Sequence, residues 1–337
     1  MRSPEIMPPT NARYANQPWA DAACSQEYQA QRAAWSASPN SDNSDNAWNV
    51  FSFSNRAGKG THAAVARLQQ LMRRLRDGAG AGQAHYLQLD IHNFFNSIDR
   101  GGLLAALEQQ IKSCRDPQRD VMLFVCQQLL QGEPASQVQW RASPRERAQV
   151  PPHKRLANSE PGCGLPIGNL SSQFFANVVL DALDQFAKHQ LKCKSYVRYV
   201  DDFVLLHEDA AQLEIWQKRI AAFLQEQLGL QLKPEIKRGS CDSGVDFLGY
   251  IVHPHYLTVR PRVAQHAHEK LTALRSERLR RNFDPQQLRS TVASYWGHFS
   301  HASAHRLRQR LLAQHPWLHT CFKNPHQPHP TFRRQSS

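Results

Sequence analysis

The segment SYVRYVDDFVLL (195–206) decides the fold, because stretches rich in β-forming residues flank the acidic pair Asp201 and Asp202. This pattern predicts a tight β-hairpin with both carboxylates at its tip. Two adjacent carboxylates repel each other unless cations lie between them. The hairpin tip is therefore a candidate cation site.

A third carboxylate lies on a short strand predicted at HYLQLDI (85–91), where Asp90 is flanked by Leu89 and Ile91. A charge in apolar surroundings needs a partner that offsets the cost of burial. Oxygen-only ligands suit magnesium better than zinc. Two magnesium ions about 3.5–4 Å apart can assist phosphoryl transfer, so the three aspartates predict that chemistry.

Hydrophobic periodicity predicts the elements around these aspartates. Helices are predicted over 61–76, 103–113, 121–130 and 170–190 and between Asp209 and Gly229, and short strands around 230–232 and 245–252. Asp99 is a predicted helix cap, and Trp216 a predicted core residue. The order strand, helix, hairpin, helix, strand predicts a split βαβ arrangement within an α+β fold.

Positive charge is concentrated at the C-terminal end of the chain. The 337 residues have a formal net charge of +13, and residues 257–337 hold 14 Lys and Arg against 3 Asp and Glu. Three helices are predicted here, the second beginning at Asp284-Pro285. A cationic helical segment indicates a polyanionic partner such as nucleic acid, and the alternative is a solvated basic tail.

Composition excludes several classes of protein. No window reaches the roughly 18 apolar residues of a membrane span, and the first thirty residues contain no apolar segment of signal-peptide type. None of the seven cysteines forms a C-x-x-C pair, which argues against a disulfide framework and a Cys-rich zinc site. The sequence predicts a soluble, cytoplasmic protein with no membrane partner.

Five segments together resemble the motifs of reverse transcriptases, in the order in which that family has them. They are LQLDIHNFFNSID (87–99), GLPIGNLSSQ (164–173), YVDD (199–202), LGLQLKPEIK (228–237) and FLGY (247–250). Part of the second motif, IGNLSSQ (167–173), is similar to diversity-generating retroelement and group II-intron-like bacterial enzymes. Two further segments are similar to the same enzymes: NRAGKGTHAAV (55–65) and SYWGHFSHASAH (294–305). The resemblance covers about residues 50–318.

The resemblance implies a right-hand polymerase with a ferredoxin-like palm, partial fingers and an α-helical thumb. The expected parts are a low-complexity segment at 1–47, partial fingers at 48–84, a palm at 85–256 with an insertion loop at 131–161, a basic thumb at 257–318 and a tail at 319–337.

The resemblance also assigns site residues. The metal site would comprise Asp90, Ile91, Asp201 and Asp202, with the three aspartates catalytic. Nucleotide-binding residues would be Phe94, Phe95, Pro166, Ile167, Gly168, Gln173 and Lys237. Primer and template contacts would be Arg56, Lys59, Tyr199, Phe247, Leu248, Gly249, Tyr250, Arg278 and Arg281.

Three of these residues have specific expected roles. Phe95 would lie under the sugar and exclude a 2′-hydroxyl, which selects dNTPs by steric clash. Ile167 stands where relatives have a Gln that contacts the nucleotide, which implies error-prone copying at template adenines. Lys237 would protonate the leaving pyrophosphate, and the alternative is a surface ion pair.

The implied activity is RNA-directed DNA polymerisation with two Mg²⁺ ions, for which Mn²⁺ can substitute. The implied partners are an RNA template, a DNA or RNA primer, dNTPs and a small basic accessory protein.

One departure from the family pattern leaves a second function open. Residues 1–50 contain only Arg2, Arg13 and Arg32 as basic residues, and no strand pair is evident among them. The fingers that grip the triphosphate are therefore expected to be truncated. The alternative is a catalytically inactive RNA-binding remnant of a retroelement reverse transcriptase.

Overall fold

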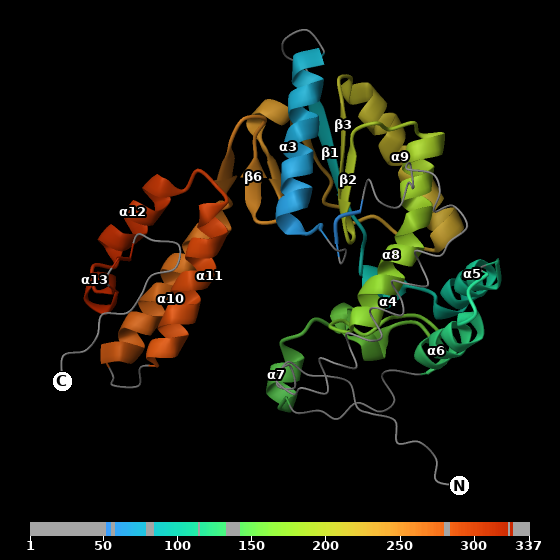
Figure 1. The fold of residues 1–337 in the computed structure, drawn as a ribbon, viewed down its shortest axis with the longest axis horizontal. Helices are drawn as coiled ribbons and strands as arrows, with labels where there is room; N and C mark the ends of the chain where they lie inside the picture. The colour runs from blue at the N-terminus through green and yellow to red at the C-terminus, as the bar shows by residue number, and fades with distance from the viewer. Residues whose placement is uncertain are drawn as a thin grey trace. The chain divides into compact units, whose positions relative to one another are not determined.

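The computed structural model describes residues 52–54, 58–78, 84–113, 115–132, 142–279, 284–322 and 324–325 of this mixed helix-and-sheet chain (Figure 1). The chain divides into two compact units. The first comprises residues 1–60, 87–205 and 211–237, and the second comprises residues 61–86, 206–210 and 238–337.

A four-stranded sheet has the order β2-β3-β1-β4, and its first three strands lie side by side in Figure 1. Its strands are β1 (His85–Asp90), β2 (Tyr196–Tyr199), β3 (Asp202–His207) and β4 (Lys237–Ser240). Strands β2 and β3 form the predicted antiparallel hairpin, with Tyr199 opposite Asp202. Strand β4 was not predicted, because its sequence KRGS shows no alternation of apolar and polar residues.

Most helices of the first unit share a core with this sheet. The helices are α4 (Phe94–Ser97), α5 (Arg100–Ser113), α6 (Arg119–Gln131), α7 (Pro144–Ala148), α8 (Leu170–Gln185) and α9 (Ala210–Leu228). Except for α7, these helices form one core with β1 and the hairpin, and Trp216 is buried there as predicted. Helix α5 begins earlier than predicted, because the Asp99 carboxylate accepts hydrogen bonds from the backbone N–H groups of Gly101 and Gly102 at 2.9 and 3.0 Å.

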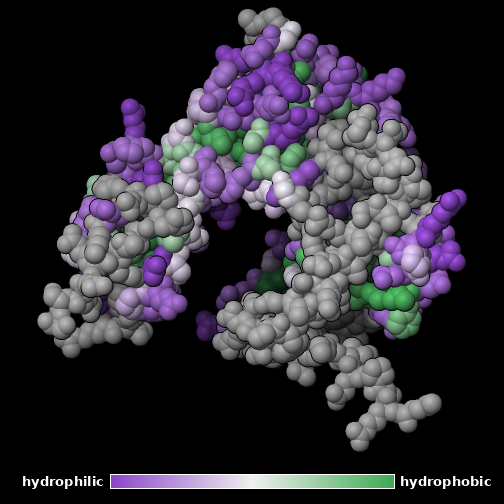
Figure 2. All heavy atoms as spheres, viewed as in Figure 1, coloured by the Kyte–Doolittle hydropathy of each residue, from purple (hydrophilic) through white to green (hydrophobic). Residues whose placement is uncertain are grey.

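Residues 131–132 and 142–161 of the predicted insertion loop are described. Besides α7, the loop contains the 3₁₀ turns η1 (Pro152–Lys154) and η2 (Leu156–Asn158). No residue of these three short elements is buried, which agrees with an exposed segment. Helix α6 exposes an apolar stripe of Val121, Phe124, Val125 and Leu129, seen as hydrophobic colour over this helix in Figure 2.

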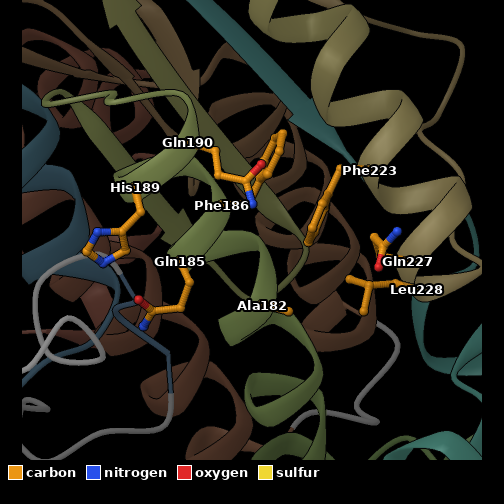
Figure 3. Close-up of a pocket in the computed structure, with 8 residues that line it drawn as sticks. All are labelled: Ala182, Gln185, Phe186, His189, Gln190, Phe223, Gln227 and Leu228. Atoms are coloured by element: carbon orange, nitrogen blue, oxygen red, sulfur yellow. The ribbon is translucent and has the colours of Figure 1, made fainter.

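Helix α8 continues into the π-helical turn η3 (Phe186–Gln190). Together with α9 these residues line a surface pocket of about 430 Å³ (Figure 3). The rings of Phe186 and Phe223 stack in it with centroids 4.2 Å apart. None of the predicted site residues lines this pocket.

The second unit combines helix α3 (Thr61–Gly78) with a three-stranded sheet of order β5-β6-β7 and four C-terminal helices. The strands are β5 (Val245–Phe247), β6 (Tyr250–Val252) and β7 (Leu257–Val259). The helices are α10 (Pro261–Leu279), α11 (Pro285–Ser300), α12 (His305–Gln314) and α13 (Leu318–Cys321). The predicted cap is present, since Asp284 Oδ1 accepts from Gln286 N at 2.8 Å.

The segment 245–252 forms a hairpin, which divides the strand region predicted there into β5 and β6. Leu248 and Gly249 form its turn with φ of +50° and +90°. A turn with two positive φ values matches the right-handed twist of the flanking strands.

None of the described helices combines the length and hydrophobicity needed to cross a lipid bilayer.

Candidate active site

The tip of the β2–β3 hairpin consists of Val200 and Asp201, between the paired residues Tyr199 and Asp202. Val200 has a φ of +55°, a left-handed conformation that a β-branched residue rarely adopts. Arg198 stabilises this turn, because its Nη1 donates to the Val200 carbonyl at 3.1 Å. The turn directs two successive acidic residues to one end of the hairpin.

Asp90 ends strand β1 and meets this hairpin tip from another part of the chain. Its side chain lies within hydrogen-bonding reach of Asp201, and its negative charge also acts on Asp202. The neighbouring Gln88 donates from Nε2 to Asp202 Oδ1 at 2.9 Å. The three predicted catalytic carboxylates therefore form one cluster.

The electrostatics of this cluster disfavour three ionised carboxylates. Burial, and then the charge of Asp90, raises the pKa of Asp201 to about 6. Burial likewise raises the pKa of Asp202 to about 6, although the hydrogen bond from Gln88 opposes this shift. A cation placed among them would offset both effects.

Lys233 supplies positive charge at the cluster. Its Nζ lies 2.5 Å from Asp90 Oδ2. Burial by itself lowers the pKa of Lys233, but the hydrogen bond and the charges of Asp90, Asp201 and Asp202 outweigh burial and raise it.

Whether the cluster could hold a metal ion depends on its carboxylate oxygens that have no hydrogen-bond partner. Within the described residues, no group of three or more His, Cys, Asp or Glu side chains is arranged to hold a metal ion. Asp90 Oδ1, however, is buried and lacks a hydrogen-bond partner. An unsatisfied carboxylate oxygen beside two further carboxylates is a donor set that suits Mg²⁺ or Mn²⁺. Ile91, predicted with this site, is fully buried and pairs through its backbone with Leu232.

The predicted nucleotide segments are held together by backbone pairing. Leu165 N donates to Phe95 O at 2.8 Å, and Gly164 N donates to Ile98 O at 2.8 Å. This pairing brings the turn that contains Ile167 next to Phe95. Ile167 is 74% exposed, so most of its side chain is accessible.

The other predicted nucleotide-binding residues differ in accessibility. Phe94 is buried, Phe95, Pro166 and Gln173 are half-buried, and Gly168 and Lys237 are exposed. The positive charge of Lys237 acts on Asp202, on which it opposes the rise in pKa. Lys237 thus lies near the aspartates, at the start of β4.

Of the predicted primer and template residues in the first unit, Tyr199 and Lys59 are described. Tyr199 is half-buried at the end of β2. Lys59 Nζ donates to the Ser52 carbonyl at 3.3 Å and lies 4.6 Å from the centroid of the Phe53 ring. Arg56 and Arg281 lie outside the described residues.

The predicted primer segment 247–250 belongs to the second unit. Phe247 and Tyr250 are fully buried, whereas the turn residues Leu248 and Gly249 are half-buried. The accessible part of this segment is therefore its turn.

Tyr250 joins two histidines beneath this turn. Its hydroxyl lies 3.2 Å from His62 Nε2 and 3.1 Å from His298 Nδ1. The ring of His62 also stacks on His301 with centroids 3.6 Å apart. His298 is half-buried, whereas His62 and His301 are exposed.

Arg278, a predicted primer or template contact, contacts helix α13. Its Nη1 lies 3.1 Å from both Thr320 Oγ1 and Cys321 Sγ. The guanidinium lies 5.8 Å from the Trp317 ring centroid.

Sequence reasoning missed three residues that contact the cluster or its turn: Gln88, Arg198 and Lys233. A signal existed for Gln88 and Arg198, since each is a polar residue among apolar neighbours of a predicted strand. Lys233 gave no such signal, because a lysine after a short strand is ordinarily solvated.

Comparisons with known proteins agree with these motifs. The model of the family "Reverse transcriptase (RNA-dependent DNA polymerase)" matches residues 40–252. No match was found among curated proteins.

Similar solved structures include two telomerases. The apo telomerase of Candida tropicalis has 11% identity and a TM-score of 0.49, over 87% of this chain and 50% of that one. Telomerase of Candida albicans, in complex with a TWJ fragment of telomeric RNA, has 10% identity and a TM-score of 0.47, over 90% of this chain and 48% of that one. The chain thus spans about half the length of these telomerases. Because the family model matches more than half of the sequence, the chain belongs to the reverse transcriptase (RNA-dependent DNA polymerase) family.

Proposed function

We propose that this protein is an RNA-directed DNA polymerase that extends a primer with dNTPs on an RNA template. Asp90, Asp201 and Asp202 are its catalytic carboxylates. The observation that supports this most is the contact of Asp90 with the hairpin tip, which joins acidic residues from distant parts of a reverse transcriptase sequence.

Two divalent ions, Mg²⁺ or its substitute Mn²⁺, would supply the positive charge that phosphoryl transfer requires. The three aspartates would hold these ions, with Ile91 as the adjacent residue at the same site. The raised pKa values of Asp201 and Asp202 support this assignment, because perturbed carboxylates cluster at functional sites.

The dNTP would bind on the paired segments that contain Phe95 and Ile167. Phe94 supports Phe95 from the core, since their rings pack edge to face with centroids 5.5 Å apart. Phe95 would exclude a 2′-hydroxyl, and Pro166, Ile167, Gly168 and Gln173 would contact the nucleotide. Lys237 would provide a proton for the leaving pyrophosphate, which its charge near Asp202 supports.

We assign the subdomains of the chain as a palm, partial fingers and a basic helical thumb, as in diversity-generating retroelement enzymes. Primer and template would contact Lys59, Tyr199, the 247–250 segment and Arg278, together with Arg56 and Arg281. The low-fidelity hypothesis depends on Ile167, whose apolar side chain offers no hydrogen bond to an incoming nucleotide. A small basic accessory protein completes the proposed partners.

Primer extension on poly(rA)/oligo(dT) tests this function. Wild type should incorporate dTTP. The incorporation rate of Asp201→Asn should be lower by roughly 10²-fold or more, because the variant lacks a carboxylate that would hold the divalent ions needed to stabilise transition-state charge. Asp120→Asn is the matched control, because Asp120 is exposed on α6 and should keep full activity.

RNA binding by fluorescence anisotropy separates the two candidate functions. If wild type incorporates no more dTTP than Asp201→Asn while both bind RNA equally, the polymerase proposal is wrong. The inactive RNA-binding remnant would then be the function.

A further inference from the structure

Asp90 and Lys233 are directly opposite residues of an antiparallel backbone pairing. Ile91 pairs with Leu232, and Lys233 N donates to Asp90 O at 2.8 Å. On the other side of this pair, His92 N donates to Gln231 O at 2.7 Å. Opposite residues in such a pairing have their Cβ atoms about 4.5–5.5 Å apart on the same face. The register therefore holds the Lys233 side chain beside the Asp90 carboxylate.

The ammonium group occupies one side of that carboxylate. Nζ lies 2.5 Å from Oδ2, while Oδ1 is buried without a hydrogen-bond partner. The positive charge also acts on Asp201 and Asp202. Lys233 thus contacts one acidic group of the cluster and acts electrostatically on the other two.

The Lys233 side chain can leave this position without disturbing the fold. It is 39% exposed, so the flexible four-carbon stem has access to solvent. The hydrogen bond from its backbone N–H to Asp90 O does not involve the side chain. Rotation about side-chain torsions alone would therefore release the carboxylate.

We propose that Lys233 is a built-in counter-cation, which neutralises the carboxylate cluster in the metal-free protein and competes with a divalent cation for Asp90. This inference rests on the proposed function, since it takes the same three aspartates as the cation site. Lys233 is accordingly a positioning residue, acting through Asp90.

The competition follows from charge and space. An ammonium at hydrogen-bonding distance from Oδ2 repels any cation bound to the same carboxylate. Without a counter-charge, the half-buried aspartates would repel one another when ionised. Lys233 therefore stabilises the metal-free cluster and weakens metal binding through the same contact.

Direct Mn²⁺ binding to the full chain, measured by electron paramagnetic resonance, tests this proposal without reference to activity. Lys233→Met keeps the aliphatic stem and should bind Mn²⁺ about tenfold more tightly than wild type, as expected for removing a like charge at close range. Lys218→Met, the matched control, removes the same charge from an exposed position on α9 and should stay within about twofold of wild type.

Mn²⁺ binding also distinguishes failure of the counter-cation proposal from failure of the metal-site assignment. If Lys233→Met binds Mn²⁺ with wild-type or weaker affinity, while Asp90→Asn abolishes binding, the counter-cation role is wrong and the metal site stands. If Asp90→Asn binds Mn²⁺ as wild type does, the metal-site assignment is wrong and the counter-cation proposal fails with it.

Lysine acetylation of wild type, read by mass spectrometry, gives a second test that needs no variant. Lys233 should react several-fold faster after saturation with Mn²⁺, because its ammonium is released from Asp90, whereas Lys218 should react at an unchanged rate. An unchanged Lys233 rate at saturating Mn²⁺ would overturn the proposal.

Discussion

Arg198 and Asp184 form a buried two-point ion pair in the first unit. Arg198 Nε and Nη2 donate to the two carboxylate oxygens at 2.8 and 2.6 Å, and the side chains are 1% and 2% exposed. Tyr196 also donates to Asp184, and Asn177 Oδ1 accepts from Arg198, Ser52 and Ser54. Since Arg198 also bonds the Val200 carbonyl, this network supports the turn that presents Asp201 and Asp202.

Arg198→Met should lower the free energy of unfolding by about 3–5 kcal/mol, because it leaves the Asp184 charge buried and unpaired. The double variant Arg198→Met/Asp184→Asn removes that charge and should recover part of the loss. Urea denaturation followed by circular dichroism measures both. A double variant less stable than Arg198→Met would contradict this reading.

Asp201→Asn should raise the melting temperature of the metal-free protein at pH 7.5. Burial and the charge of Asp90 raise the pKa of Asp201 to about 6, so its ionised form is disfavoured in the folded state. An amide of the same shape removes that penalty. Calorimetry in the presence of EDTA measures the shift, and a lower melting temperature for Asp201→Asn would show that its charge stabilises the cluster.

Leu248→Asn should stabilise the protein by about 1 kcal/mol, because asparagine tolerates a positive φ better than leucine and Asn-Gly is a favoured hairpin turn. Gly249→Ala is the opposing change. Its Cβ would meet His298 Cε1 at 3.0 Å at a φ of +90°, so stability should fall. Thermal melts of both variants check these predictions. If both variants raised the melting temperature, or both lowered it, the turn assignment would be contradicted.

The His62–Tyr250–His298 cluster should make stability fall as the pH is lowered from 7.5 to 5.5. Burial lowers the pKa of both histidines, and the charge of His301 lowers both further. Their unfolded forms therefore bind protons more readily, and stability is lost as the pH falls through the folded-state pKa values.

Melting temperatures at the two pH values test this dependence. The decrease should be smaller in His298→Gln, which keeps a hydrogen-bonding group beside Tyr250. The exposed His305→Gln, at the start of α12, is the control and should keep the wild-type decrease. An equal decrease in all three proteins would exclude the cluster as the cause.

Ile167→Gln should change stability by less than about 0.5 kcal/mol, since the side chain is 74% exposed. It should also lower misincorporation opposite template adenines by restoring a polar contact to the nucleotide. Sequencing cDNA made from an adenine-containing template by both proteins checks this. Equal wild-type error rates at adenines and at other bases would remove the low-fidelity hypothesis.

Much of the local structure followed from the sequence. Hydrophobic periodicity predicted α9, and the stretches rich in β-forming residues around the acidic pair predicted the hairpin. Asp99 and Asp284 cap helices as expected. The motifs also indicated the family correctly, because their order along the chain can be read directly from the sequence.

Contacts between distant segments could not be predicted in the same way. The sequence by itself determined most of the longer helices, the β2–β3 hairpin and which three aspartates belong to one motif set, because periodicity and capping act within a few residues. Only the tertiary structure decided that Lys233 lies opposite Asp90, that Arg198 is buried against Asp184, and that Tyr250 joins two histidines. Pairing register and long-range packing determine these neighbours, and a one-residue change of register would place a different side chain beside each of them.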